Sequence, residues 1–251
     1  IKTLNFGWGF FSSFIRKARL SPLGLKFSIM VDMGIRNITF TNGEYYHVFN
    51  RGVDKRIIYN TKEQQYFFFN RLKLLNTIDS RKYIANKRSR YKDKIITGNG
   101  EELISIVAYC LLPNHFHLLL KQKVDNGISQ FMQRLGTSYT KFFNQQEDRS
   151  GSLFQGKFKA THLSDNFSLP ILSAYVNLNY KHHQIDSTKN LVKSSLFEYF
   201  DENFGDGICN QTEIHDIINE IGSINDYKQF IKQASITFTE NKGKSLSISD
   251  F

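Results

Sequence analysis

Short stretches rich in apolar, β-branched and aromatic residues recur along the first two thirds of the chain, each bounded by turn-forming residues. Such stretches are typical of β-strands. The first of them ends at Arg51-Gly52, and the last follows a basic turn. The predicted strands are 43–50, 104–109, 115–122 and 158–163.

Apolar residues at helical spacing predict three helices, two between these strands and one after the last. Thr61 is a good N-cap for the first helix, since Gln64 follows three positions later. Asp165 or Asn166 can cap the third, where Pro170 is tolerated in the first turn. The predicted helices run from 61 to about 78, from 126 to 143, and from 166 through 179.

The order of these elements, β-α-β-β-α-β and then α, predicts an α+β protein with a ferredoxin-like antiparallel sheet and one added helix. Beyond about residue 191, periodic apolar positions in 214–221 and 227–231 predict a helical C-terminal appendage. Met30 and Met33 can each serve as a start. We therefore expect an N-terminal extension (1–32), a main domain (33–185) and the appendage (186–251).

The composition is that of a folded protein, and its charge favours a negatively charged partner. Of 251 residues 40% are hydrophobic, and the 23 Phe and 12 Tyr against 3 Pro argue against disorder. The formal net charge of +10 favours a polyanion, either nucleic acid or an anionic membrane surface. No apolar run approaches the ~20 residues of a membrane-spanning helix. Cys110 and Cys209 match no metal-binding spacing, and Cys110, in an apolar strand, is expected to be a buried free thiol that suits a reducing cytoplasm.

Basic residues concentrate in two segments that are candidates for contact with phosphates. Residues 81–94 carry seven Lys or Arg against one acid, and 149–159 form a basic turn. Either segment contacts nucleic acid or is a solvated loop, and Phe154 and Phe158 in the second either stack on bases or belong to the core. The candidate DNA contacts are Arg51, Arg88, Arg90, Lys157 and Lys159.

The predicted strand 115–122 begins with two histidines separated by one apolar residue. On a strand His115 and His117 project from the same face about 7 Å apart, while Phe116 points to the other face. Two such imidazoles can share one metal ion. Taken alone, the pattern is a weak signal, and one core histidine with one that is partly exposed is the more common arrangement.

A second group of polar residues lies on the predicted third helix. Tyr175 and Asn179 are four positions apart, so they share one helical face. The amide oxygen can act as a third metal ligand and the tyrosine as a nucleophile beside the metal. By spacing alone, a tyrosine in an apolar helix is more often a core residue.

Four blocks of the sequence, which follow one another in the order found in the family, resemble the single-tyrosine transposases of the His-hydrophobic-His superfamily. The resemblance is strongest to the branch associated with repetitive extragenic palindromes. The resemblance covers roughly 33–185. Members of that family commonly have proline after the helical asparagine, whereas this chain has Tyr180, which leaves the end of the helix in question. The four blocks are 45–52, 112–119, 149–159 and 175–179.

The resemblance implies that 33–185 is a transposase catalytic domain. His115 and His117 would bind a divalent metal, Mg²⁺ or Mn²⁺, with Asn179 in the place of the helical polar ligand. Tyr175 would attack a DNA phosphate and form a 5′-phosphotyrosine. The substrate would be single-stranded DNA that flanks a hairpin. The protein would act as a monomer or a homodimer. Its location would be a bacterial-type cytoplasm, and the nucleoid when it is bound to DNA.

Other residues and other functions compete with this interpretation. Tyr139 lies within an apolar helical stripe and is expected to pack in the core. His162 is less well placed, and His182 and His183, just past the third helix, are expected to be solvated. The alternatives are a non-catalytic, domesticated nucleic-acid-binding protein on the same fold and a metal-dependent hydrolase that uses water.

Overall fold

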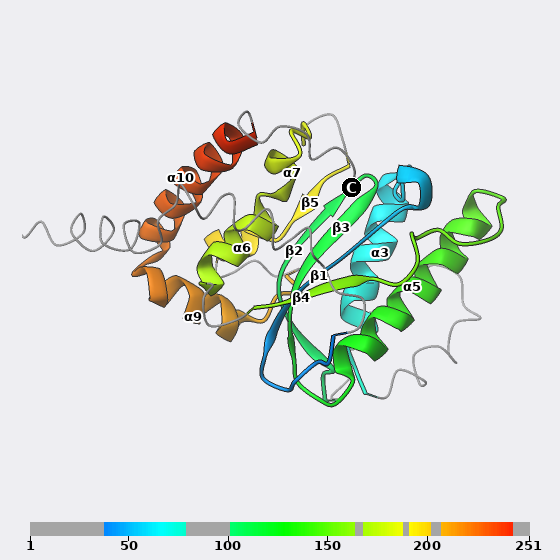
Figure 1. Ribbon diagram of the computed structural model, residues 1–251, viewed down its shortest axis with the longest axis horizontal. Coiled ribbons are helices and arrows are strands. Elements are labelled where there is room, and N and C mark those ends of the chain that lie inside the picture. The colour runs from blue at the N-terminus through cyan, green and yellow to red at the C-terminus, as the bar shows by residue number, and fades with distance from the viewer. Residues whose placement is uncertain (1–37, 79–100, 164–167, 188–190, 202–206, 243–251) are drawn as a thin grey trace, which may run out of the picture.

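The computed structural model describes residues 38–78, 101–163, 168–187, 191–201 and 207–242 (Figure 1). A five-stranded antiparallel sheet in the order β4-β1-β3-β2-β5 forms its centre. The strands and helices are β1 (Tyr45–Arg51), α3 (Lys62–Leu74), β2 (Ile104–Leu112), β3 (His115–Gln122), α5 (Gly127–Gln146), β4 (Lys159–His162), α6 (Leu169–Asn177), α7 (Asn179–His182), β5 (Lys193–Ser194), α8 (Leu196–Phe200), α9 (Gln211–Ile221) and α10 (Ile224–Lys242).

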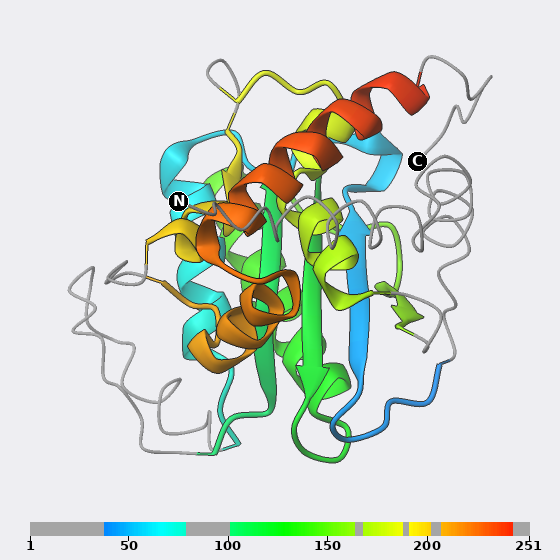
Figure 2. The ribbon, with the colours of Figure 1, turned by 90° about the vertical axis from the view of Figure 1, so that its left-hand side faces the viewer.

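The predicted α+β fold with a ferredoxin-like sheet is confirmed. β1-α3-β2-β3-α5-β4 has the expected order, with β1 and β3 in the middle, and β5 adds a fifth strand beside β2. Helices α3 and α5 cover one face of the sheet, and α6, α7, α9 and α10 lie on the other (Figure 1). Figure 2 views the second layer directly, with α10 crossing in front of the strands.

The bounds of the elements follow local interactions, and most differ from the prediction by a few residues. β3 has the predicted bounds, while β2 continues to Leu112, where the turn to His115 ends it. Helix α3 has the predicted Thr61 cap, whose side chain accepts a hydrogen bond from the Gln64 amide (3.2 Å). It ends at Leu74 and not near 78, because the Asn76 side chain pairs with both backbone groups of Ile104 and turns the chain toward β2.

The third predicted helix is interrupted. α6 ends at Asn177 and α7 begins at Asn179, with Leu178 between them at φ −99° and ψ 11°. The Asn177 carbonyl accepts a hydrogen bond from the Ser194 hydroxyl (2.8 Å), so the helical bonding pattern stops there. Ser168 occupies the N-cap position of α6, whereas the predicted caps Asp165 and Asn166 lie outside the described residues.

The C-terminal elements share the core of the sheet. β5 pairs with β2, and the Tyr199 hydroxyl donates to the Val107 carbonyl (2.8 Å). Tyr227 of α10 is buried and its hydroxyl lies 3.0 Å from that of Ser173 on α6. Cys110 is a buried free thiol, as predicted. The boundary expected near 185 stays a prediction, and 1–32 lie outside the described residues. Among the described helices, none has the length and apolar character needed to cross a membrane.

Candidate active site

The two histidines of β3 lie together on the face of the sheet that carries α6. His115 pairs with Arg51 on β1, and His117 pairs with Phe49. The ring centroids of His115 and His117 are 5.1 Å apart. Phe116 points to the opposite face, 5.1 Å from the ring of Phe68 on α3. The alternation predicted from the sequence is therefore present at this strand end.

One nitrogen of each imidazole is held by a neighbour, and the other is not. Nδ1 of His115 lies 2.6 Å from Oδ1 of Asn114, and Nδ1 of His117 lies 2.9 Å from Nε2 of His47. Nε2 of both histidines is buried and has no hydrogen-bond partner within the described part of the chain. A buried polar atom without a partner is costly, and an imidazole lone pair in this position suits a metal ion.

The surroundings keep both imidazoles neutral. Burial lowers the pKa of His115 to about 3, and the nearby positive charge of Arg51 lowers it too, while the Asn179 amide acts in the opposite direction. Burial also lowers the pKa of His117 well below its usual value, together with the surrounding histidines. Neutral imidazole is the form that binds a metal, so both side chains are ready to do so at neutral pH.

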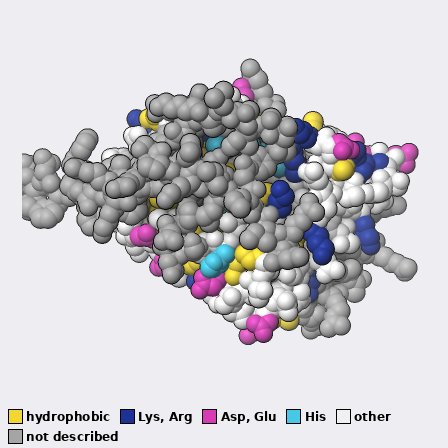
Figure 3. Space-filling model, in the orientation of Figure 1, with side chains coloured by type: hydrophobic (Ala, Val, Ile, Leu, Met, Phe, Trp, Pro, Cys, Tyr) yellow, Lys and Arg dark blue, Asp and Glu magenta, His cyan; other side chains and the backbone are white. Residues whose placement is uncertain are grey.

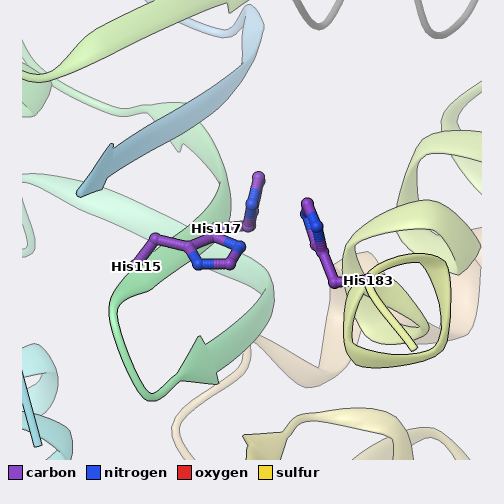
Figure 4. A group of neighbouring side chains, drawn as sticks. All are labelled: His115, His117 and His183. Atoms are coloured by element: carbon purple, nitrogen blue, oxygen red, sulfur yellow. The ribbon is translucent and has the colours of Figure 1, made fainter. Parts of the chain in front are cut away.

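His183 joins this pair, and the expectation that it is solvated is wrong. It is half-buried at the C-cap of α7, with its ring centroid 4.7 Å from that of His115. One ring nitrogen of each of the three histidines lies within 4.8 Å of the others. Figure 4 shows the three imidazoles facing one another, two from β3 and one from the helical side. The spacing of 175, 179 and 183, four positions each, is the sequence pattern that could have revealed it.

The three nitrogens fit a divalent ion after a small adjustment. Two ligands with metal–nitrogen bonds of ~2.1 Å lie at most ~4.2 Å apart. The observed limit of 4.8 Å is larger by ~0.6 Å, so the nitrogens would have to move slightly closer together around an ion. The unpartnered Nε2 atoms of His115 and His117 show that the donors are available.

Tyr175 and Asn179 lie at the same site, although they belong to different helices. The Tyr175 ring, 4% exposed, stands edge-on to His117 at 6.2 Å between centroids. Asn179 is fully buried beside His115, and its amide makes no hydrogen bond among the described residues. The interruption at Leu178 corrects the prediction of one continuous helical face. Even so, the chain brings all four predicted residues together.

The remaining tyrosine and histidine candidates are also accounted for. Tyr139 is fully buried on the other face, where its hydroxyl donates to the Ile58 carbonyl, as expected of a packing residue. His162 lies 3.0 Å from the Glu44 carboxylate. His182 is half-buried with its ring 5.6 Å from that of Tyr175, so the expectation that it is solvated is wrong as well.

The candidate DNA contacts divide between the two faces of the sheet. Arg51 is half-buried next to His115, and the Lys159 ammonium lies 5.9 Å from the centre of the Phe49 ring, which neighbours His117. Lys157 is exposed and lines a cleft of about 850 Å³ beside α5, on the opposite face. Figure 3 shows Lys and Arg side chains gathered near histidines on the face viewed. Arg88 and Arg90 lie outside the described residues.

The backbone of the basic turn 149–159 is hydrogen-bonded to the end of β1, and the phenylalanines of this turn are not presented for stacking on bases. The Gln155 amide donates to the Arg51 carbonyl (2.8 Å), and the Val53 amide donates to the Leu153 carbonyl (2.9 Å). Phe154 is 8% exposed and Phe158 packs against the core. Of the two roles left open for these phenylalanines, the core role is the observed one.

Two comparisons find known proteins that are similar to this chain. Residues 70–179, which include both histidines of β3, Tyr175 and Asn179, match the family described as IS200-like transposases. One solved structure, a REP-associated tyrosine transposase bound to a REP hairpin, is similar with 14% identity and a TM-score of 0.42, over 66% of this chain and 84% of that one. No curated protein matches the chain.

Proposed function

We propose that this protein is a transposase that cleaves and rejoins single-stranded DNA through a covalent bond between Tyr175 and a 5′ phosphate, at a metal site built on His115 and His117. The observation that carries the proposal is the position of Tyr175, whose ring lies against His117 within one chain. The two unpartnered Nε2 atoms beside it support the metal. A packing role for Tyr175 would require neither feature.

His115, His117 and His183 would hold the ion, with Asn179 as a further ligand from the start of α7. When bound, a divalent ion there would neutralise the charge of the scissile phosphate and orient it for attack. Of the two ions that the family resemblance implies, a set rich in nitrogen donors favours Mn²⁺ over Mg²⁺, which prefers oxygen.

Tyr175 supplies the nucleophile. Its phenol oxygen forms a bond to phosphorus, the bond from phosphorus to the 3′ oxygen breaks, and that oxygen takes up a proton as the phenol loses one. A phenol is a weak nucleophile until it loses its proton, so a bound cation and the positive charge of Arg51 would be needed to favour the ionised form. A 3′-hydroxyl of another strand end then attacks the phosphotyrosine and releases Tyr175. Each step exchanges one phosphodiester for another, so no ATP is needed.

Two basic side chains on this face would hold the DNA backbone. Arg51 is next to His115, where its fixed positive charge can bind a non-bridging phosphate oxygen. Lys159 lies one strand away above Phe49 and can bind a neighbouring phosphate. Because the sequence blocks resemble those of transposases acting near palindromes, we propose single-stranded DNA that flanks a hairpin as the substrate.

Trapping the covalent adduct tests the proposal. Hairpin-flanked single-stranded DNA labelled at its 3′ end is incubated with the full chain and Mn²⁺, and the adduct is resolved on a denaturing gel. We expect the adduct with the wild type and with Tyr139→Phe, the matched control, and none with Tyr175→Phe or without metal. An adduct in Tyr175→Phe would refute the assignment. DNA binding without any wild-type adduct would instead favour the non-catalytic alternative.

The position of Tyr175 beside the histidines of its own chain also supports an active site completed within one subunit. A mixture of Tyr175→Phe and His117→Ala chains should then remain inactive. Recovery of cleavage in the mixture would indicate that the tyrosine helix is exchanged between the two subunits of a homodimer.

A further inference from the structure

His47 is a buried histidine on β1, 1% exposed, next to the proposed metal site. Its Nε2 lies 2.9 Å from Nδ1 of His117, and the two ring planes are within 6° of parallel. The pairing of β1 with β3 puts Phe49 opposite His117, which makes His47 the diagonal neighbour of His117. A polar ring so deeply buried is costly in free energy, and an apolar side chain would fill this place at lower cost.

The hydrogen bond between the two rings has two arrangements with opposite consequences. When His117 donates from Nδ1–H, its Nε2 keeps the lone pair that a metal needs. When His47 donates, the proton of neutral His117 resides on Nε2 and that nitrogen cannot bind a metal. The partner of His117 therefore decides whether Nε2 is a ligand.

We propose that His47 is a positioning residue that accepts the Nδ1–H hydrogen bond of His117 and so presents the Nε2 lone pair of His117 to the metal. The proposal rests on the proposed function, because it assumes a metal at this site. Metal-binding histidines generally donate their second ring N–H to such a partner, which fixes both tautomer and ring orientation.

The neighbouring ligand is arranged in the same way, which supports this direction of donation. Nδ1 of His115 lies 2.6 Å from the side-chain oxygen of Asn114, and an amide oxygen can only accept. His115 therefore carries its proton on Nδ1 and exposes Nε2. Asn114 belongs to the turn between β2 and β3, whereas His47 belongs to β1, so two separate elements orient the two ligands alike.

Metal affinity measured without DNA tests the role of His47. Titration of the full chain with Mn²⁺ in a calorimeter should show binding weakened about tenfold to a hundredfold in His47→Leu, which has no acceptor. His47→Gln, whose side-chain oxygen can take the place of Nε2, should restore affinity to within about threefold of the wild type. Phe49→Leu is the matched control, because Phe49 packs on both rings without a hydrogen-bonding atom. Equal losses in His47→Leu and Phe49→Leu would overturn the proposal.

A second measurement reads the tautomer itself in metal-free protein. ¹⁵N NMR of the His117 ring should show the proton on Nδ1 in the wild type and in His47→Gln, and a shift toward Nε2–H in His47→Leu. A wild-type His117 protonated on Nε2 would overturn the proposal even if His47→Leu fails to fold. The proposed function fails by a different result, the absence of a Tyr175 adduct, so the two failures are distinguishable.

Discussion

Replacing Glu198 with alanine should destabilise the whole chain, because this side chain joins the C-terminal segment to the centre of the sheet. Glu198 is 1% exposed and accepts three hydrogen bonds. The Tyr109 hydroxyl of β2 donates to one oxygen (2.8 Å), and the amides of Ile208 and Cys209 donate to the other (2.9 and 2.8 Å). Burial and the nearby Glu198 raise the pKa of Tyr109, so its hydroxyl keeps the proton that it donates.

The expected magnitude follows from the groups that Glu198→Ala leaves behind. Three buried donors lose their acceptor, and each costs about 1–3 kcal/mol when it stays unsatisfied. Since water entering the space of the lost side chain recovers part of this, we expect a loss of about 4 kcal/mol, a large fraction of the 5–15 kcal/mol typical of a folded domain. Glu198→Gln, which keeps one oxygen acceptor, should lose roughly half as much.

Urea denaturation followed by far-UV circular dichroism measures the effect. Glu102→Ala is the matched control: Glu102 is exposed and pairs with Lys123 at 3.0 Å, and such a surface pair contributes less than about 1 kcal/mol. Because the C-terminal elements share the core of the sheet, we expect one transition shifted as a whole. A separate early transition in Glu198→Ala, with the main transition unchanged, would refute this reasoning and show that 186–251 unfold independently.

Four further outcomes are expected. His183→Ala should weaken Mn²⁺ binding at least about tenfold in calorimetry, since one of three clustered nitrogens is lost. Arg51→Ala should slow DNA cleavage and flatten its dependence on salt, whereas Lys157→Ala, on the opposite face, should leave the cleavage rate within about twofold. Thr61→Ala should cost about 1 kcal/mol in urea denaturation, because the α3 cap is lost. In metal-free protein, stability should fall as the pH drops below about 6.5. Burial lowers the pKa of His115 to about 3 in the folded chain, so the unfolded chain binds protons first, and urea midpoints at neutral and mildly acidic pH check the sign.

Much of the site could be predicted because its patterns are local. The period of two along a strand brings His115 and His117 to one face, and the fit of 115–122 to strand composition gave the bounds of β3. The four-residue spacing of Tyr175 and Asn179 predicts that both side chains lie on one side of a helix, and both lie at the site even though the helix between them is interrupted. Tyr139 could be distinguished from Tyr175 because Tyr139 lies within the apolar stripe of a helix, which is typical of a core residue.

His47 could not be recognised in the same way, although it lies within one of the blocks that resemble the family. Its contact with His117 joins positions 70 residues apart and depends on the register between β1 and β3. Register is a long-range property that the pattern of one strand does not specify completely. The same holds for the two faces of the sheet that separate Arg51 from Lys157, since Arg51 at the end of β1 and Lys157 in the basic turn before β4 are both simply basic residues in the sequence.

The position of His183 depends on a part of the chain outside the matched family region. In an uninterrupted α-helix, residues eight positions apart differ by about 80° in direction, so His183 would share the face of Tyr175 only in part. The interruption at Leu178 changes that direction, and Lys181 and His182 both bond back to the Leu178 carbonyl as α7 begins. Ser194 and Ser195, from the short strand β5 and the residue after it, hold Asn177 by its carbonyl and side-chain oxygens. A two-residue strand has no recognisable sequence pattern, yet it helps to set the end of α6. The C-terminal elements therefore contribute to the geometry of the site as well as to the stability of the sheet.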